Sequence, residues 1–297
     1  MTVNSQSDLK QLLEKEVSKY KGIAVPVRSS LLFRLTTDKL PLRKLHPNPD
    51  DDFCFPDIGP SESIISNYIK EFSRFHHDIT AAEMAGSQVF DPIHVQKIRP
   101  KGYMILNGHH RWAAALRSGH KTIRVKIVNV TREKDIRKAL KGVQNIRRVA
   151  LDLDEVVFAA PDEPAEKKLR FPWCKLYPQP VRIGIPSLFH YLAERHYDIW
   201  VYSYQLISDD HIRRLFRHYH AGVPFIFTGI GQQGLHSKDA LTGMEKMICD
   251  KYQVTFHIDQ KSVLRISGGE FQDYPLPGNA VWSAEVEDIF RKLDQNG

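Results

Sequence analysis

The spacing of hydrophobic residues changes near residue 147 and divides the sequence into two parts. In the first part, apolar positions recur with helical or with alternating spacing over short segments that polar loops separate. The predicted helices cover residues 7–20, 61–75, 109–118 and 131–145, and the predicted strands cover residues 39–46, 91–98, 102–108 and 122–130. This mixture predicts a small α/β domain that an amino-terminal helix precedes.

The second part begins with RRVALDLDEVVF, residues 147–158, a continuous apolar run typical of a parallel strand buried on both faces. Helix-like and strand-like segments then alternate. The predicted helices cover residues 187–197, 208–220 and 237–252, and the predicted strands cover residues 198–204, 223–230 and 254–259. This alternation predicts a doubly wound parallel sheet over residues 147–297. The sequence therefore predicts an α/β protein of two domains with a boundary near residues 141–147.

Composition and charge narrow the class of protein. The chain has 297 residues, of which 42% are hydrophobic, and its formal net charge is +7. The amino-terminal segment is polar, the three cysteines are far apart, and no apolar stretch approaches the roughly 20 residues of a spanning helix. We therefore expect a cytoplasmic protein without a membrane partner. The positive charge favours anionic partners. Since the basic residues are spread along the chain, nucleic acid is a partner that the sequence allows but does not favour.

The stretch ILNGHHRWAAALRSG, residues 105–119, places Gly108, His109, His110 and Arg111 between a strand end and a helix start. First-turn amides of a helix favour an anion, and Gly108 permits close backbone approach. Arg111 can bind phosphate through two donors, and both histidines can donate to it. These residues alone leave two interpretations open, a phosphate-binding turn or a helix start with solvated histidines. A metal site is disfavoured because adjacent histidines diverge on a helix.

The first part resembles the ParB/sulfiredoxin-like domain in the order of its segments, which are PLRKLHPNP, a helix, FDPIHVQKI, MILNGHHRWAAALRSG and TIRVKIVNV. The resemblance implies a domain over residues 38–143 after a helical extension over residues 1–37. In that superfamily a Gly-x-x-Arg box binds phosphate. The residues to which this role is carried over are Asn107, Gly108, His109, His110 and Arg111.

Within the superfamily, the residue after the glycine separates the branches. Sulfiredoxins carry a catalytic Cys where this chain has His109, which excludes sulfiredoxin chemistry. ParB proteins usually carry Glu-Arg-Arg after the glycine. The ParB-like free serine kinases carry Asp-Gly-His-His-Arg, the most similar pattern, and this chain has Asn107 in place of their Asp. The resemblance implies a kinase that uses ATP or ADP to phosphorylate a small hydroxyl compound.

Such a kinase needs a carboxylate that takes the proton from the hydroxyl group. Because Asn107 is not a base, the carboxylate has to come from elsewhere in the chain. The acidic loop after the first predicted strand and the helix start that follows it offer Asp50, Asp51, Asp52 and Glu62. The sequence does not separate them, and each can instead be a solvated surface carboxylate. Asp52 and Glu62 are the two that we take as catalytic candidates.

The first strand of the second part ends with two carboxylates, Asp152 and Asp154. Ligands bind at this edge of an open α/β sheet. One carboxylate can attack phosphorus while the other protonates the leaving oxygen. Clustered anions need a cation, and Mg²⁺ suits carboxylate and phosphate oxygens. Ser203 and Asp259 at later strand ends and Lys238 at a helix start complete a candidate phosphoryl-transfer site.

These motifs, in this order, resemble the haloacid dehalogenase (HAD) superfamily over residues 147–292. The resemblance implies a HAD-like Rossmannoid sheet with Asp152 as nucleophile, Asp154 as acid and base, Ser203 and Lys238 as phosphate-binding residues, and Asp152, Asp154 and Asp259 as the magnesium site. Many members carry a second acid where this chain has Gln260, and Lys246 is a second candidate for the lysine. Residues 159–180 leave room for only a minimal cap, which predicts an open active site.

Together these features predict a phosphoryl-transfer enzyme. Its first domain would bind a nucleotide and act as a kinase, and its second would be a magnesium-dependent phosphatase or phosphotransferase that works through an aspartyl-phosphate. The partners would be a nucleotide and a small phosphorylated or hydroxyl substrate. The alternative is a nucleotide-dependent regulatory or DNA-binding ParB-like protein with a non-catalytic HAD scaffold.

Overall fold

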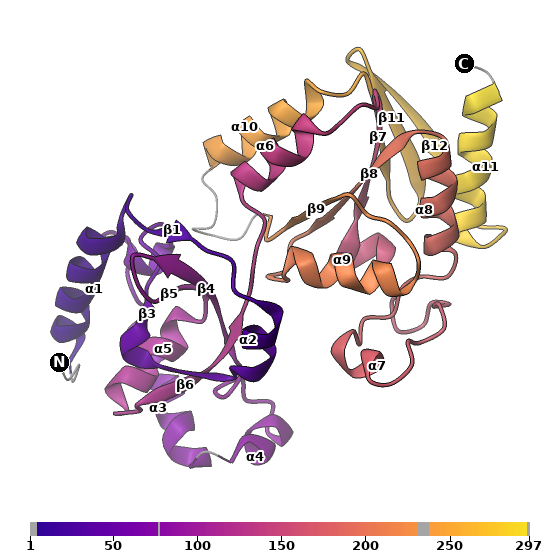
Figure 1. The fold of residues 1–297 in the computed structure, drawn as a ribbon. Helices are drawn as coiled ribbons and strands as arrows, with labels where there is room; N and C mark the ends of the chain where they lie inside the picture. Colours follow the sequence, from indigo (N-terminus) through magenta and orange to yellow (C-terminus); the bar gives the residue numbers. More distant parts are fainter. Residues whose placement is uncertain (1–4, 77, 231–237, 296–297) are drawn as a thin grey trace. The chain divides into compact units, whose positions relative to one another are not determined.

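Two compact units make up the chain (Figure 1). The computed structural model describes residues 5–76, 78–230 and 238–295, and the side chains of residues 238–241 are outside the described part. The first unit ends at Asn129, and the second begins at Val130 and includes the described residues from 238 onward. None of the described helices is both long and apolar enough to span a membrane.

The first unit is built on one mixed sheet. Its strands, in spatial order, are β2 (Lys39–Pro41), β6 (Thr122–Ile127), β4 (Ile93–Arg99), β5 (Tyr103–Asn107) and β3 (Leu45–His46), and β1 (Val25–Pro26) pairs with β4. The pairs β4–β6 and β3–β5 are parallel, and β4–β5 is an antiparallel hairpin. The centre of this sheet is therefore β4, which lies between β6 and β5, the strand that leads into the Gly108 turn.

Helices bury one face of this sheet. The helices that contribute to its core are α1 (Gln6–Tyr20), α3 (Glu62–Phe75), α4 (Ile79–Met84) and α5 (His109–Arg117). The helix α2 (Leu31–Thr36) has no buried residue, and η1 (Leu42–Lys44) and η2 (Asp52–Cys54) are short 3-10 turns. The core joins Ile65 of α3 and Trp112 of α5 to Ile93 and Ile105 of the sheet. Because residues 113–115 of α5 are alanines that are completely or almost completely buried, α5 packs closely on the sheet and its first turn is held rigidly.

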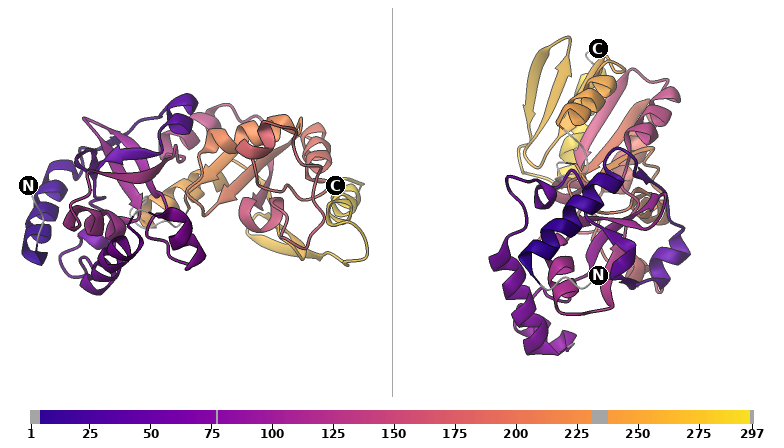
Figure 2. Two further views of the ribbon diagram at one scale, coloured as in Figure 1. Left: turned by 90° about the horizontal axis from the view of Figure 1, so that it is seen from below. Right: turned by 90° about the vertical axis from the view of Figure 1, so that its left-hand side faces the viewer.

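The second unit has a sheet with a parallel centre. The spatial order is β12 (Glu270–Pro275), β11 (Ser262–Ser267), β10 (Val254–Ile258), β7 (Arg147–Asp152), β8 (Tyr197–Ser203) and β9 (Phe225–Thr228). The four strands from β10 to β9 are parallel, as the alternating pattern predicts, and β11 and β12 extend them as an antiparallel hairpin. The hairpin lies beside α11 (Trp282–Gln295) in both views of Figure 2.

Helices cover both faces of this sheet. Apolar residues of α8 (Ile185–Glu194), α9 (Asp209–His218) and α11 pack in one core, and those of α6 (Glu133–Lys141) and α10 (Lys238–Cys249) pack in another. The prediction of a mixed α/β fold is confirmed. The sequence position of α6 suggested that it belongs to the first domain, but by contacts it belongs to the second unit, because Ile136 and Leu140 pack against Trp200 and Phe225.

The segment between β7 and α8 carries little regular structure. It contains the four-residue helix α7 (Trp173–Leu176). Isolated bridges join Phe158 to Val181 and Ala165 to Arg182. Among residues 159–180, which were expected to form a minimal cap, the regular structure is therefore limited to this short helix and these bridges.

Candidate functional site

Gly108 forms the turn between β5 and α5. Its φ of +98° is left-handed, and a Cβ placed on it would lie 2.4 Å from Cγ2 of Ile93. Glycine alone accommodates both this φ and this close approach. Gly108 is also the N-cap of α5, where no side chain caps the helix. The first-turn amides of α5 therefore face outward at the positive end of the helix dipole.

His109 is buried, with 5% of its surface exposed. Its Nε2 accepts a hydrogen bond from the Asn48 N–H at 3.2 Å, which puts the ring proton on Nδ1, 3.5 Å from Oδ1 of Asp51. Burial lowers the pKa of His109 to about 3, so the ring is neutral and this contact is not an ion pair. We expected His109 to donate to phosphate. Its contacts instead anchor the loop that contains Asn48.

His110 makes the corresponding contact with another part of the same loop. Its Nε2 accepts a hydrogen bond from the Ser61 N–H at 3.1 Å, and its ring packs edge-on against Phe53 at 5.0 Å between centroids. Burial lowers the pKa of His110 as well. The two histidines therefore hold the loop from Asn48 to Ser61 against α5 as neutral acceptors, rather than forming a pair of cations.

Arg111 lies beside the Gly108 backbone, with its Nη2 3.4 Å from where a Cβ of Gly108 would be. Its Nη1 donates to the carbonyl oxygens of Asp91 at 2.8 Å and of Gln88 at 3.3 Å. These bonds use one nitrogen of a group that has five N–H donors. The guanidinium is thus held in place at the turn and retains donors for an anion.

A pocket of about 730 Å³ opens at this turn. Asn107, Gly108, His109, His110 and Arg111 all line it, so the structure brings the whole predicted box together. The other lining residues are Asp51, Asp52, Phe53, Ile58, Gly59, Ser61, Ile64, Tyr68, Gln88 and Leu106. The pocket combines a helix N-terminus and an arginine with apolar and aromatic side chains, a combination that suits the phosphates and the base of a nucleotide.

The acidic loop contributes to the pocket through two of its carboxylates. Asp51 caps η2, because its Oδ1 accepts a hydrogen bond from the Phe53 N–H at 3.0 Å, and burial raises the pKa of Asp51. Asp52 also lines the pocket. Asp50 is exposed and is not among the lining residues. Of the loop candidates for a base, Asp52 is therefore at the pocket and has no capping role.

Glu62 has a different role from the one considered for it. Its two carboxylate oxygens accept hydrogen bonds of 2.6 and 2.8 Å from Arg117. This pairing lowers the pKa of Glu62, and Glu62 is not among the pocket-lining residues. The pair joins the start of α3 to the end of α5, so its evident role is to hold these helices together.

In the second unit, β7 ends at Asp152, where the chain turns into η3 (Leu153–Val157), a single π-type turn. Oδ1 of Asp152 accepts hydrogen bonds from the N–H groups of Asp154 at 2.7 Å and Glu155 at 2.9 Å. The carboxylate therefore caps the turn that follows it. Its other oxygen has no hydrogen-bond partner among the described residues and is the atom available for chemistry.

Asp154 is held by the end of the neighbouring strand. Its carboxylate accepts hydrogen bonds from the Ser203 hydroxyl at 2.9 and 3.1 Å and from the Tyr204 N–H at 3.0 Å. Burial raises the pKa of Asp154, although the bonds from Ser203 and Tyr204 act in the opposite direction. We expected Ser203 to bind phosphate, but here its hydroxyl serves Asp154, because both residues lie at the same edge of adjacent strands β7 and β8.

Asp152 and Asp259 line a second pocket, of about 500 Å³, at the carboxyl edge of this sheet. Oδ1 of Asp259 accepts hydrogen bonds from the N–H groups of Lys261 and Ser262 at 2.6 and 2.7 Å. Gln260, which follows Asp259, donates to the carbonyl oxygen of Glu155 at 2.8 Å. The strand ends thus present two oriented carboxylates to one pocket.

The predicted three-carboxylate magnesium site does not form among the described residues, where no three His, Cys, Asp or Glu side chains gather closely enough to hold a metal ion. The reason is that Asp154 faces Ser203 and Tyr204. Asp152 and Asp259 remain, and a pair of carboxylates fits Mg²⁺, which binds one or two carboxylates together with substrate phosphate and water.

The two lysine candidates cannot both be placed. Lys238 is the first residue of α10, and its side chain lies outside the described part of the chain. Lys246, in the last turn of the same helix, is exposed and does not line the Asp152 pocket. The described lining residues of that pocket include one cation, Arg148, whose Nε donates to the Thr255 hydroxyl at 2.8 Å. Sequence reasoning missed this residue, since nothing local marks it.

Comparison with known proteins gives one family match. The profile of the ParB N-terminal domain matches residues 63–145. A comparison with curated proteins gives no match. Solved structures that resemble the chain include the C-terminally truncated chromosome-partitioning protein ParB from Caulobacter crescentus, complexed to the centromeric parS site, at 21% identity and a TM-score of 0.23. The match covers 37% of this chain and 51% of that one, so it spans about half the length of that protein. The chain contains a ParB-like domain, and the Gly108 turn lies within it.

Proposed function

We propose that this protein is a phosphoryl-transfer enzyme whose second unit reacts through Asp152 and whose first unit holds a nucleotide. One observation carries the proposal. Asp152, with one carboxylate oxygen fixed by two amides, lies two residues before Asp154, whose pKa is raised by burial. This arrangement supports Asp152 as nucleophile and Asp154 as proton donor at the carboxyl edge of a parallel sheet, where ligands of such sheets bind.

The reaction would proceed in two steps. In the first, an oxygen of Asp152 attacks the phosphorus of a phosphate ester, the ester P–O bond breaks, and Asp154 gives its proton to the leaving oxygen. In the second, Asp154, now ionised, takes a proton from a water or an acceptor hydroxyl, whose oxygen attacks the phosphorus of the aspartyl-phosphate and releases Asp152. The hydrogen bonds from Ser203 and Tyr204 stabilise Asp154 while it is ionised.

Magnesium has a defined place in this proposal. Asp152 and Asp259 would hold it, since both line the same pocket. When bound, Mg²⁺ would offset the negative charges of the phosphoryl oxygens and of the nucleophile, which otherwise repel each other. The protein's own share of this work is to orient the two carboxylates through the four backbone N–H bonds that they accept.

The test uses the full chain with p-nitrophenyl phosphate and Mg²⁺. Release of phosphate should fall by at least about a thousandfold in Asp152→Asn, because the amide is not a nucleophile. The matched control is Asp162→Asn, an exposed carboxylate in the small cap segment, which should leave the rate unchanged. Turnover that persists in Asp152→Asn, or that is absent from the unchanged protein with every phosphate ester tried, would contradict the proposal.

The first unit would bind the phosphates of ATP or ADP at the Gly108 turn. The support is the pocket of about 730 Å³, the uncapped N-terminus of α5 and the fixed guanidinium of Arg111. A small hydroxyl substrate beside the nucleotide would lose its proton to Asp52, the loop carboxylate at the pocket. The kinase reaction is therefore part of the same proposal. The phosphorylated product of the first unit would belong to the chemical class that the second unit consumes.

Calorimetry with ATP tests this half of the proposal. Arg111→Ala should weaken binding by about tenfold or more, the loss expected for charge-assisted hydrogen bonds. Arg111→Lys should recover part of the affinity, because it keeps the charge but not the planar fork. Arg74→Ala, at the exposed end of α3 and outside the pocket, is the control. Equal affinities for all four proteins would exclude the turn as the nucleotide site.

A second candidate function is binding of nucleic acid, favoured by the net charge of +7 and by the ParB-like domain. Binding to phosphate backbones would weaken steeply with salt. A gel shift with mixed-sequence DNA at rising salt concentration distinguishes the two functions. Salt-sensitive DNA binding without phosphate release would favour this candidate over the enzyme.

A further inference from the structure

A pocket of about 750 Å³ lies on the face of the second sheet opposite to the Asp152 pocket, since Arg147 and Phe256 line the one and the alternate residues Arg148 and His257 line the other. Arg147, which lines it, is the first residue of β7, and Asp152 is the last. Five residue steps of extended strand separate them by about 16 Å. None of the described residues lines both this pocket and the Asp152 pocket. The pocket is therefore a separate feature of the second unit.

The sheet register explains how the pocket arises. Tyr197, Arg147 and Val254 are neighbours in one row across β8, β7 and β10. Two residues further along, Phe256, Arg265 and Gln272 form the next row across β10, β11 and β12. Since alternate residues of a strand share a face, both rows face the same side. In the second row Phe256 is apolar, whereas Arg265 and Gln272 of the hairpin are polar, so that face carries both kinds of side chain.

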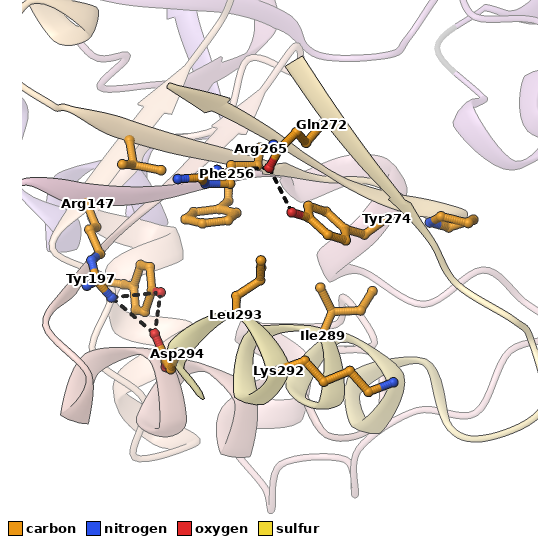
Figure 3. A pocket seen from close by; sticks show the side chains of 12 residues that line it. Arg147, Tyr197, Phe256, Arg265, Gln272, Tyr274, Ile289, Lys292, Leu293 and Asp294 are labelled. Carbon is orange, nitrogen blue, oxygen red and sulfur yellow. Dashed lines mark hydrogen bonds and ion pairs between the residues drawn. The ribbon is translucent and has the colours of Figure 1, made fainter. Parts of the chain in front are cut away.

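The last turns of α11 close the pocket from the other side. Figure 3 shows Phe256 and Tyr274, from the strands, on one side and Ile289 and Leu293, from the helix, on the other, with open space between them. Phe256 is buried, whereas Tyr274, Ile289 and Leu293 are partly buried. Two aromatic rings facing two aliphatic side chains form walls that suit a flat apolar group.

One end of the pocket is already neutralised. Asp294 accepts hydrogen bonds from Arg147 at 3.1 Å and from the Tyr197 hydroxyl at 3.0 Å, and Arg195 lies 3.5 Å from its other oxygen. Figure 3 shows the Arg147–Tyr197–Asp294 group as a closed triangle. A ligand anion gains less there, because Arg147 and Tyr197 are already paired with the carboxylate of Asp294.

The balance of charges is different on the side of the pocket that the β11–β12 hairpin forms. Nη1 of Arg265 donates to Oε1 of Gln272 at 2.8 Å, and the Tyr274 hydroxyl donates to the same oxygen at 2.9 Å. Among the described residues, Arg265 faces no carboxylate within ion-pair distance, and its Nε and Nη2 have no hydrogen-bond partner. Three of the lining residues are cations, Arg147, Arg265 and Lys292, and one is an anion, Asp294. On the hairpin side, Arg265 is therefore the lining cation that has no carboxylate partner among the described residues.

From these walls and this charge we infer that the pocket binds a small aromatic carboxylate, with its ring between Phe256 and Leu293 and its carboxylate on the guanidinium of Arg265. Arginine pairs with carboxylates through two parallel N–H bonds, and Gln272 holds one edge of the guanidinium so that the other can face the ligand. The site is independent of the phosphoryl-transfer proposal, because it shares no residue with the Asp152 pocket.

Calorimetry on the full chain with 2-naphthoate tests the inference, and its neutral relative 2-naphthamide serves as the matched ligand. Naphthoate should bind about tenfold or more tightly than naphthamide, as expected for one charge-assisted pair. Arg265→Gln should abolish that difference, since it removes the charge while keeping much of the length. Arg291→Gln, an exposed cation on α11 outside the pocket, should leave both affinities unchanged.

A second variant changes the wall of the pocket that α11 provides. Leu293→Asp places a carboxylate in the apolar wall and should remove naphthoate binding, and far-ultraviolet circular dichroism checks that the fold is kept. If Leu293→Asp does not fold, Arg265→Gln alone decides. The inference is overturned if naphthoate does not bind at millimolar concentration, if it binds no better than naphthamide, or if Arg265→Gln keeps the full affinity.

Discussion

The Gly108 turn and the Asp152 turn use the same position in the fold in opposite ways. Each begins at the carboxyl end of a sheet strand and leads into a helical turn. At Gly108 the helix has no capping side chain, so its amides remain turned outward. At Asp152 the carboxylate itself caps the turn and accepts hydrogen bonds from two of the turn's N–H groups. The first turn thus offers donors to an anion, and the second offers a fixed anion to its surroundings.

The difference shows how a strand-end turn acquires its chemistry. Removing the side chain at the N-cap leaves the helix dipole free for a ligand phosphate. Placing a carboxylate there uses the same amides to orient a nucleophile. The neighbouring side chains follow the same division, since Arg111 stands beside the first turn and Asp154 beside the second.

The raised pKa of Asp154 predicts a pH dependence of the second unit. As pH rises through that pKa, Asp154 loses the proton that the leaving oxygen needs, so the rate should fall on the alkaline side. Asp154→Asn should lower the rate by about a hundredfold and remove this alkaline limb. The loss should be larger for an alkyl phosphate than for p-nitrophenyl phosphate, whose leaving group needs less help. Equal losses for both esters would exclude Asp154 as the acid.

Gly108→Ala tests whether the first turn depends on the bare backbone. The new Cβ would meet Ile93 at 2.4 Å and would sit at a left-handed φ, so the first unit should lose about 3 kcal/mol of stability. Gly119→Ala is the matched control, because its φ of +72° is also left-handed but nothing lies within 4 Å of its Cβ. It should cost about 1 kcal/mol. If both variants lose the same free energy of unfolding in urea, the contact with Ile93 makes no contribution to the cost of Gly108→Ala.

The buried His109 predicts acid sensitivity of the first unit. Its pKa is about 3 in the folded chain against an ordinary value of 6.5. Below pH 6.5 the unfolded chain takes up a proton that the folded chain does not. The stability should therefore fall by about 1.4 kcal/mol per pH unit from this group as pH drops towards 3.

His109→Gln measures this contribution directly. The variant should be less stable at pH 7, because the contacts with Asn48 and Phe53 are altered, but its stability should decline less steeply with acid. Urea unfolding of both proteins between pH 7 and pH 5 gives the two slopes. The same slope in both would mean that His109 titrates normally in the folded chain.

The Glu62–Arg117 pair should give the smallest effect. The Glu62 side chain is 32% exposed, so solvent screens the pair, and Glu62→Gln should cost about 1 kcal/mol or less, decreasing with salt. ATP binding and any kinase rate should be kept, whereas Asp52→Asn should lower the kinase rate. If Glu62→Gln loses kinase activity while its stability is normal, Glu62 is again a candidate for the catalytic base.

The sequence predicts much of this fold because the hydrophobic spacing is strong. The continuous run over residues 147–152 and the alternation after it gave the parallel strands and their order along the chain. The β11–β12 hairpin was not predicted, although Gly268 and Gly269, both at positive φ, form the two-residue turn that signals a hairpin. Its strands are largely polar, so their pattern does not stand out from a loop.

The residues of the candidate sites were found where their signal is local. Gly108 and Arg111, and Asp152 and Asp154, stand next to one another in the sequence, and the structure brings each set to one turn. The role of His109 depends on Asn48, which is 61 residues away. The bonds of Glu62 to Arg117 and of Asp154 to Ser203 span comparable distances. Such contacts are set by tertiary packing, and no spacing in the sequence encodes them.

Peptide mapping of the acid-quenched protein, after incubation with acetyl phosphate and Mg²⁺, tests the central claim most directly. A phosphoryl group on the peptide that contains Asp152, absent from Asp152→Asn and retained in Asp162→Asn, is the predicted result. An unmodified Asp152 peptide, or a phosphoryl group found on Ser203 in its place, would contradict the assignment of Asp152 as the nucleophile.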